Sequence, residues 1–359
     1  MTAEPAEPAD NTALRARYDA LLLDLDGTLY LGKDAIPGTA EALGDHPQRL
    51  LYVTNNASRS PADVAVHLRE LGFPAADDDV VTSSQAAARV LQERVPAGSN
   101  VLVVGTDALA GEVERVGLRP VRSAADSPVA VVQGHSPQTG WPILAEACYA
   151  IRAGALWVAS NTDTTLPTER GMAPGNGSMV AVLRSATGQE PIVAGKPAAP
   201  LMEDALARGG SRSSLVVGDR LDTDIEGANT VGLPSLLVLT GVSTAEDLLR
   251  AAPERRPTFV ALGLDALNAP IDTEEGEHWE VRRDGVDLVL AAGSGSDSKA
   301  GDALAALHTA TAAAWANPNF ARLVPADDAA RRAVKAWADP APEVGGRAVR
   351  LRSPVGGIG

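Results

Sequence analysis

The 359-residue sequence has few cysteines and no long apolar run. Its single cysteine, Cys148, cannot form an internal disulfide and has no metal-cage spacing around it, so we interpret it as a core thiol on a helix. No run of eighteen apolar residues occurs, which argues against a membrane-spanning helix. The first residues, MTAEPAEPADNTA, are acidic and rich in Pro and Ala, unlike a signal peptide. We therefore expect a disordered tail over residues 1–18, a cytoplasmic location and no membrane insertion.

Positive charge is also scarce. The 31 Lys and Arg residues against 46 Asp and Glu residues give a net charge of −15, which argues against nucleic acid or an anionic membrane surface as a partner. An anionic substrate would need a local positive group to offset this charge. The four lysines are Lys33, Lys196, Lys299 and Lys335.

Apolar segments of strand length alternate with helical segments along the chain. Strands are expected at 19–24, 49–54, 213–219 and 233–241, and helices at 60–72 and 222–232. Buried strands separated by helices predict an α/β fold, a doubly wound parallel Rossmann-like sheet covered on both faces. In such sheets the reactive groups gather at the carboxyl ends of the strands.

Acidic residues stand at these strand ends. Asp24 and Asp26 directly follow three leucines, Asp219 and Asp224 follow a later strand, and Thr54 ends the second strand. Acids that converge in this way repel one another unless a hard cation lies among them. The most plausible cation is Mg²⁺.

Each of these features has an ordinary structural explanation when it is taken alone. A single Asp at a strand end is usually a helix cap or a turn former, and Asp222 fits a cap of the following helix. Residues 54–56 and 195–197 could equally be an ordinary loop and an ordinary turn. Their joint occurrence in one order favours a functional site.

The same residues resemble the four motifs of haloacid-dehalogenase-like (HAD) phosphatases, in their order. The matching strings are Asp24-Leu25-Asp26-Gly27-Thr28, Thr54-Asn55-Asn56, Lys196, and the segment GDRLDTD at 218–224. The T-N-N form and the GDRLDTDI string are similar to the subfamily of NagD-type, pyridoxal, phosphoglycolate and glycerol-3-phosphate phosphatases, which carry a C2-type cap. The resemblance covers roughly residues 19–270.

This resemblance implies a role for each matched residue. Asp24 would be the nucleophile that forms an aspartyl-phosphate, and Asp26 would be the general acid and base. Thr54 and Asn55 would hold phosphate oxygens, while Lys196 would neutralise the phosphate and the nucleophile.

The resemblance also implies a Mg²⁺ cofactor. Its ligands would be the Asp24 carboxylate, the Asp26 main-chain carbonyl and Asp219, with Asp224 behind them.

Over 140 residues lie between Thr54 and Lys196, far more than one crossover needs. They contain their own alternation, with strands expected at 100–105, 127–134 and 155–161, and helices at 107–117, around Cys148 and at 175–188. We therefore expect a core of residues 19–82 and 191–270, and an inserted α/β cap over 83–190.

Loop 161–175 of this cap resembles the specificity stretch of the family. Asn161, Asp163, Glu169 and Arg170 are candidates to face the substrate. A plain surface loop is an equally open interpretation.

Residues 271–359 form a predicted small α+β extension of unknown role. A hairpin is expected over 278–293, turned at Asp284-Gly285, followed by a helix over 299–316. The β-β-α order is similar to pieces of acyl-CoA-dependent acetyltransferases, but their pyrophosphate loop is absent. We expect this region to pack on the rest of the protein.

We expect, in all, a Mg²⁺-dependent phosphomonoesterase acting on a small metabolite. Glycerol 3-phosphate or another short polyol phosphate is the first candidate substrate, followed by phosphoglycolate, pyridoxal 5′-phosphate and sugar phosphates. A receiver-type or non-catalytic phosphate-binding protein is the remote alternative, disfavoured by Asp26 and by the cap. The oligomeric state stays open, with the cap and the C-terminal region as candidate surfaces for a homo-oligomer.

Overall fold

The structure is a computed structural model, and it describes residues 12–44, 47–168, 170–211, 213–271, 278–293, 303–338 and 346–351. The chain forms two compact units. The first comprises Met1–Arg49 and Ser211–Gly359, and the second comprises Leu50–Gly210. Within the described residues, no helix is long and apolar enough to cross a membrane.

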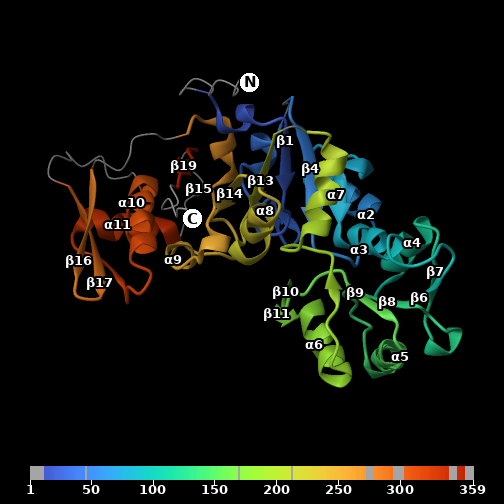
Figure 1. Ribbon diagram of the computed structural model, residues 1–359. Coiled ribbons are helices and arrows are strands. Elements are labelled where there is room, and N and C mark those ends of the chain that lie inside the picture. Colours follow the sequence, from blue (N-terminus) through green and yellow to red (C-terminus); the bar gives the residue numbers. More distant parts are fainter. Residues whose placement is uncertain are drawn as a thin grey trace, which may run out of the picture. The chain divides into compact units, whose positions relative to one another are not determined.

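A mainly parallel sheet forms the centre of the first unit (Figure 1). The strand order is β19-β15-β14-β13-β1, with only β19 antiparallel to its neighbour. The strands are β1 (Ala20–Leu23), β13 (Ser214–Gly218), β14 (Ser235–Val238), β15 (Phe259–Ala261) and β19 (Val349–Arg350). The first four are buried along their whole length, as strands covered on both faces must be. The α/β class with a parallel sheet, predicted from the sequence, is confirmed.

The pairing of β1 with β13 sets the position of the acidic residues. Leu23 lies opposite Val217, so Asp24 and Asp219 leave the sheet at the same edge. Asp24 N–H still donates to the Val217 carbonyl at 2.9 Å. The two strand ends expected to meet therefore do meet within this unit.

The described residues of the first unit also form helices. They are α1 (Thr39–Ala42), α8 (Glu226–Thr230), α9 (Ala245–Leu249), α10 (Ala303–Ala316) and α11 (Asp328–Ala338), together with the small hairpin β2 (Tyr30–Leu31) and β3 (Asp34–Ala35). The helix expected over 222–232 is divided: a π-helical turn at Leu221–Ile225 precedes α8. The Arg220 carbonyl accepts from both Asp224 N–H and Ile225 N–H, so the turn holds one residue more than an α-helical turn.

The N-terminal tail is shorter than expected. Leu14–Arg17 forms a 3₁₀ turn, and Leu14 is completely buried. Leu14 N–H donates to the Ala269 carbonyl at 2.8 Å, and Arg15 Nη1 donates to the Ala42 carbonyl at 2.7 Å. These contacts fix residues 12–18, so the prediction of disorder is wrong for them. Residues 1–11 lie outside the described residues.

The C-terminal region contributes a second, three-stranded sheet to the first unit. It contains the hairpin β16 (Trp279–Asp284) and β17 (Asp287–Ala292) with β18 (Leu323–Pro325), and the predicted turn at Gly285 is present. The region packs on α9: Trp315 Nε1 donates to the Leu248 carbonyl at 2.9 Å, and the Arg250 guanidinium lies 4.4 Å from the Phe320 ring centroid.

The second unit holds a strand pair and three helices that position its polar loops. Strand β4 (Arg49–Thr54) pairs in parallel with β5 (Val80–Thr82), and the helices are α2 (Pro61–Glu70), α3 (Ser83–Gln92) and α7 (Ala199–Gly209). Ser60 and Asp63 form a reciprocal capping box at the start of α2, where the sequence places Pro61 in the first turn.

A five-stranded parallel sheet completes the second unit (Figure 1). Its order is β12-β9-β8-β6-β7. The strands are β6 (Asn100–Val104), β7 (Arg119–Val121), β8 (Ala130–Gln133), β9 (Leu156–Ala159) and β12 (Ile192–Val193), and the helices are α4 (Asp107–Arg115), α5 (Trp141–Arg152) and α6 (Asn176–Thr187). Cys148 packs half-buried against the core of α5 and α6, as expected. Strands β10 (Thr165–Thr168) and β11 (Gly171–Pro174) pair in antiparallel fashion where a loop was expected.

Candidate active site

Three carboxylates converge at the edge of the first unit's sheet. One oxygen from each of Asp24, Asp219 and Asp224 lies within 4.8 Å of the others, and we call this group the acidic cluster. Asp219 is 0% exposed and Asp224 1% exposed, so two of the three are withdrawn from water. Anions this close and this buried need a compensating positive charge.

Neighbouring groups fix the orientation of the Asp219 carboxylate. Val242 N–H donates to its Oδ2 at 2.6 Å, and Thr28 Oγ1 donates to its Oδ1 at 3.3 Å. The same Thr28 hydroxyl lies 3.5 Å from Asp24 Oδ2, so it bridges two members of the acidic cluster. Thr28 belongs to the D-x-D-G-T string, which explains that position of the motif.

Two glycines, Gly27 and Gly241, pack closely against the Asp219 carboxylate. A Cβ added to Gly27 or to Gly241 would overlap the Asp219 carboxylate, and Gly27 also has a φ of +93°. The site is thus a close-fitting set of hard oxygen donors, which suits Mg²⁺. Asp24, Asp219 and Asp224 are the carboxylates that could hold such an ion. The sequence analysis expects Asp24 and Asp219 as ligands and Asp224 behind them.

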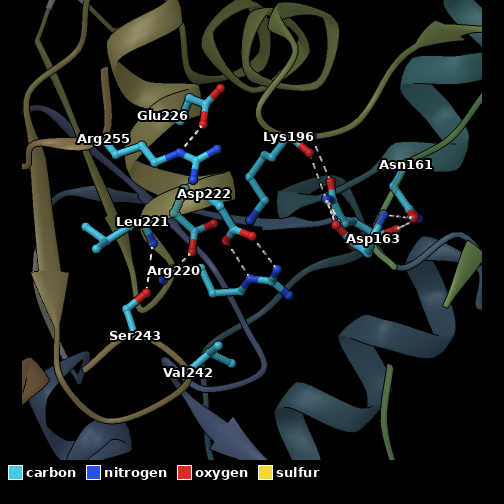
Figure 2. Close-up of polar contacts among 12 residues, drawn as sticks. Asn161, Asp163, Lys196, Arg220, Leu221, Asp222, Glu226, Val242, Ser243 and Arg255 are labelled. Carbon is cyan, nitrogen blue, oxygen red and sulfur yellow. Dashed lines mark hydrogen bonds and ion pairs between the residues drawn. The ribbon is translucent and has the colours of Figure 1, made fainter. Parts of the chain in front are cut away.

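Asp222 does not join the acidic cluster (Figure 2). Its carboxylate accepts two hydrogen bonds from Arg220, from Nε at 3.0 Å and from Nη2 at 2.9 Å. Burial alone would raise the pKa of Asp222, but the Arg220 guanidinium outweighs this effect and lowers it. Neither the π-helical turn nor α8 has a side-chain cap, so the cap considered for Asp222 is not formed.

Asp26 lies beside the acidic cluster in the sequence but has a different environment. Asp26 has an exposed surface. The protein around its carboxyl group nevertheless reduces the hydration of that group, and this desolvation raises the pKa of Asp26 above its ordinary value. A hydrogen bond from Gly32 N–H to Oδ1, at 3.4 Å, opposes this rise only partly. A carboxyl group with a raised pKa is suited to carry and transfer a proton.

The side chain of Asn55 joins two predicted site residues of the second unit. Its Nδ2 donates to the Asp163 carboxylate at 3.2 Å and to the Lys196 carbonyl at 3.0 Å, while its Oδ1 accepts from Lys196 N–H at 2.8 Å. Figure 2 shows Lys196 and Asp163 in these contacts. Both amide hydrogens of Asn55 are therefore used within the protein.

The Asn55 main-chain carbonyl is held from two further sides. Asn161 Nδ2 donates to it at 2.7 Å, and Ser83 Oγ donates to it at 2.6 Å. We call Asn55, Asn161, Asp163 and Lys196 the amide network. Sequence reasoning missed Ser83, because a serine at the first turn of a helix carries no local sign of a partner 28 residues away.

Lys196 and Thr54 are, with Asn55, the residues of this unit that the sequence predicts to bind phosphate. Lys196 is 3% exposed, and its Nζ donates to the Val53 carbonyl at 2.9 Å. Thr54 ends β4, and its Oγ1 accepts from Asn56 N–H at 3.1 Å, which leaves the hydroxyl proton to be donated.

Of the remaining specificity candidates, the structure describes Arg170 alone, and its main-chain contact lies outside this network. Arg170 lies exposed in the turn between β10 and β11, where its N–H donates to Thr168 Oγ1 at 3.3 Å. Glu169 lies outside the described residues. Among the four candidates, the structure therefore brings Asn161 and Asp163 to the amide network and places Arg170 in the hairpin turn.

Known proteins share this chain's sequence and fold. A family model described as haloacid dehalogenase-like hydrolase matches residues 21–119, and a HAD-hydrolase-like model matches residues 193–267. The D-glycerol 3-phosphate phosphatase of Mycobacterium tuberculosis is 50% identical over 336 residues, which cover 90% of this chain and 95% of that protein. The 5′-nucleotidase YutF of Bacillus subtilis is 38% identical over 236 residues, 64% of this chain and 91% of that protein.

Solved structures agree with the sequence comparison. The glycerol phosphate phosphatase of M. tuberculosis in complex with magnesium superposes with a TM-score of 0.84 at 50% identity, covering 91% of this chain and 99% of that one. The p-nitrophenyl phosphatase of Archaeoglobus fulgidus gives a TM-score of 0.63 at 29% identity, covering 69% and 97%. The chain belongs to the haloacid dehalogenase-like hydrolase family.

Proposed function

We propose that the chain is a Mg²⁺-dependent phosphatase that hydrolyses a small phosphomonoester, with glycerol 3-phosphate as its first substrate. The observation that carries the proposal is the convergence of Asp24, Asp219 and Asp224 at one sheet edge. Half of the residues are identical to a glycerol 3-phosphate phosphatase over nearly the whole of that protein, which supports the choice of substrate.

Asp24 and Asp26 carry out the chemistry in this proposal. An Asp24 carboxylate oxygen bonds to phosphorus as the ester oxygen leaves, and Asp26 gives that oxygen its proton. Water then attacks the aspartyl-phosphate, Asp26 takes a proton from the water, and inorganic phosphate is released with Asp24 restored. The raised pKa of Asp26 supports its role as the proton carrier.

Thr54, Asn55 and Lys196 bind the phosphoryl group. The Thr54 hydroxyl retains a proton to donate, and the main-chain N–H of Asn55 is the donor that we assign, because its side-chain hydrogens go to Asp163 and Lys196. The Lys196 ammonium supplies the positive charge that an anionic substrate needs in a protein of net charge −15.

Mg²⁺ would be held by the carboxylates of Asp24 and Asp219 and by the Asp26 carbonyl, with Asp224 behind them. When bound, it neutralises developing charge on the phosphoryl oxygens. Arg220 N–H donates to Asp224 Oδ2 at 3.1 Å, which holds that carboxylate in its place behind the ligands.

The division of the chain follows from the same proposal. Residues 19–82 and 191–270 form the catalytic core, residues 83–190 form a cap that selects the substrate, and residues 271–359 pack on the core without lining the site. A cytoplasmic location remains a prediction of the sequence. So does assembly into a homo-oligomer through the cap or the C-terminal region.

A phosphate-release screen over a few dozen metabolites tests the proposed substrate. The panel includes glycerol 3-phosphate, phosphoglycolate, pyridoxal 5′-phosphate, sugar phosphates and nucleoside monophosphates. We expect the highest kcat/KM for glycerol 3-phosphate. A nucleotide or sugar phosphate ranked first would favour the activities in the names of other relatives, a 5′-nucleotidase and acid sugar phosphatases.

A further inference from the structure

The loop of residues 240–243 holds Asp219 and the turn that follows it. Val242 N–H donates to Asp219 Oδ2 at 2.6 Å, and Ser243 N–H donates to the Asp219 main-chain carbonyl at 3.1 Å. The Ser243 hydroxyl accepts from Leu221 N–H at 3.0 Å, where the π-helical turn begins (Figure 2). One short loop therefore fixes a carboxylate of the acidic cluster and the start of the turn that carries another.

Strand β14 and helix α9 flank this loop. β14 ends at Val238, and its parallel pairing with β13 fixes that side of the loop. α9 begins at Ala245 and has only five residues. A helix this short is not stable by itself in water, so tertiary packing has to hold it in place. The position of Ser243 therefore depends on what packs against α9.

Helix α10 of the C-terminal region supplies part of that packing. Trp315 of α10 is 4% exposed, and its Nε1 donates to the Leu248 carbonyl at 2.9 Å. This carbonyl lies in the last turn of α9, where helix carbonyls have no α-helical partner. The Arg256 guanidinium lies over the Trp315 ring, 4.7 Å from a ring centroid. One tryptophan thus contacts both the end of α9 and the segment after it.

A second set of contacts joins the residue after α9 to the C-terminal region. Arg250 donates from Nη2 to the Ala321 carbonyl at 2.8 Å and from Nη1 to the Phe320 carbonyl at 3.3 Å. Ile225 of the π-helical turn and Leu248 of α9 belong to one cluster of buried side chains, together with those of α10. The packing of the C-terminal region is therefore continuous with that of the turn beside the acidic cluster.

We propose that the C-terminal region supports the metal site: residues 303–338 hold α9 in place, and α9 holds Ser243 and Val242 against Asp219. This inference rests on the Mg²⁺ site of the proposed function and goes beyond it, because it gives a task to a region that contributes none of the proposed ligands. Trp315 and Ser243 are positioning residues, since each acts on the site through other residues.

Calorimetric titration of Mg²⁺ into the full-length protein tests this support. Trp315→Phe keeps an aromatic ring but removes the N–H that donates to the Leu248 carbonyl. We expect the Kd for Mg²⁺ to rise about fivefold in this variant. In Ser243→Ala, which changes the loop itself, we expect a rise of about tenfold, because one hydrogen bond is typically worth a factor of roughly two to ten in an equilibrium constant.

Trp337→Phe is the matched control. Trp337 is 5% exposed, and its Nε1 donates to the Ala303 carbonyl at 2.6 Å, a bond of the same kind that joins α11 to α10. Its loss should lower the melting temperature about as much as Trp315→Phe does, and it should leave the Kd for Mg²⁺ within about twofold of wild type. An unchanged Kd in Trp315→Phe would overturn the proposal. Equal rises in both tryptophan variants would do the same, because they would mean a general loss of stability.

Arg250→Ala provides a second variant should Trp315→Phe not fold. The Arg250 side chain is 43% exposed, so its removal leaves the buried cluster intact while it deletes the bonds to the Phe320 and Ala321 carbonyls. We expect the Kd for Mg²⁺ to rise in this variant too, by about threefold. A Kd equal to that of Trp337→Phe would contradict a support through α9.

Hydrogen–deuterium exchange of residues 242–249 gives a test that needs no metal. We expect faster exchange in Trp315→Phe than in wild type, and no change in Trp337→Phe. Unchanged exchange in Trp315→Phe would overturn the support of α9. If wild type bound no Mg²⁺, the metal site of the proposed function would fail, and the exchange result would still decide whether the C-terminal region holds this loop.

Discussion

The Asn55 side-chain amide donates to the Asp163 carboxylate, 108 residues further along the chain, at 3.2 Å. Asn55 follows the end of β4, where the sequence predicts phosphate binding. Asp163 lies in loop 161–175, where the sequence predicts substrate selection. The bond therefore links two parts of the chain with different proposed tasks, within one compact unit.

Asn55→Ala removes this bond together with two bonds to Lys196. Because each lost bond leaves a partly buried group without its partner, we expect kcat/KM to fall by about a hundredfold and the melting temperature to decrease. Steady-state kinetics and thermal unfolding measure the two effects.

Asn56→Ala is the control for this change. Asn56 is exposed, and among the described residues its side chain accepts only from Ser58 N–H at 2.8 Å and Ser58 Oγ at 2.6 Å. Comparable losses in the two variants would show that the network around Asn55 has no special part in catalysis.

The sequence predicted the residues whose place follows from strand order. Asp24 and Asp219 come directly after buried apolar runs, and parallel pairing of β1 with β13 brings them to one edge. Asp224 follows at a fixed short distance, within the turn after β13. Local pattern and parallel topology are sufficient for such positions.

Contacts that depend on tertiary packing were not predictable in this way. Ser83 and Asn176 look like ordinary helix-start residues, and only the packed structure shows their partners. The hairpin at 165–174 was missed because Pro167 and the turn residues favour a loop by composition. The disordered tail was expected from the acidic, Pro- and Ala-rich start of the chain, and that composition gives no sign that Leu14 and Arg15 are buried.

Asp26→Asn should discriminate between leaving groups. An alkoxide needs a proton to leave, whereas p-nitrophenolate is stable without one. We expect kcat on glycerol 3-phosphate to fall about a thousandfold. The loss of kcat on p-nitrophenyl phosphate should be about a hundredfold or smaller, because a general acid matters most for the poorer leaving group. Equal losses on the two substrates would argue against a general acid at this position.

Gly241→Ala should weaken Mg²⁺ binding without replacing a proposed ligand. The added Cβ would overlap the Asp219 carboxylate and displace it. We expect the Kd for Mg²⁺, measured by calorimetry, to rise at least about tenfold, since ligand placement decides affinity for an ion that demands near-ideal octahedral geometry.

Gly111→Ala is the matched control, because nothing lies within 4 Å of the added Cβ and the residue lies inside α4. This change should leave the Kd unaltered and stabilise the protein by up to about 1 kcal/mol. An unchanged Kd in Gly241→Ala would remove Asp219 from the metal site.

Chelation should abolish activity. We expect EDTA to remove turnover, Mg²⁺ to restore it, and Ca²⁺ to compete without supporting it, because the larger and more flexible Ca²⁺ shell does not hold in-line geometry. Phosphate release after exhaustive dialysis against chelator, followed by metal addition, measures this. Full activity in metal-free protein would contradict the proposed role of the acidic cluster.

The most direct test of the account is the turnover number of Asp24→Asn, compared with wild type at saturating substrate and Mg²⁺. An amide is not a nucleophile toward phosphorus, so we expect kcat to fall by at least about a thousandfold, the scale of loss seen when an essential covalent group is removed. The fold should survive, since Asp24 is only partly buried and its main-chain bond to Val217 is unchanged. Activity within about tenfold of wild type, in a variant with an unchanged melting temperature, would contradict covalent catalysis by Asp24.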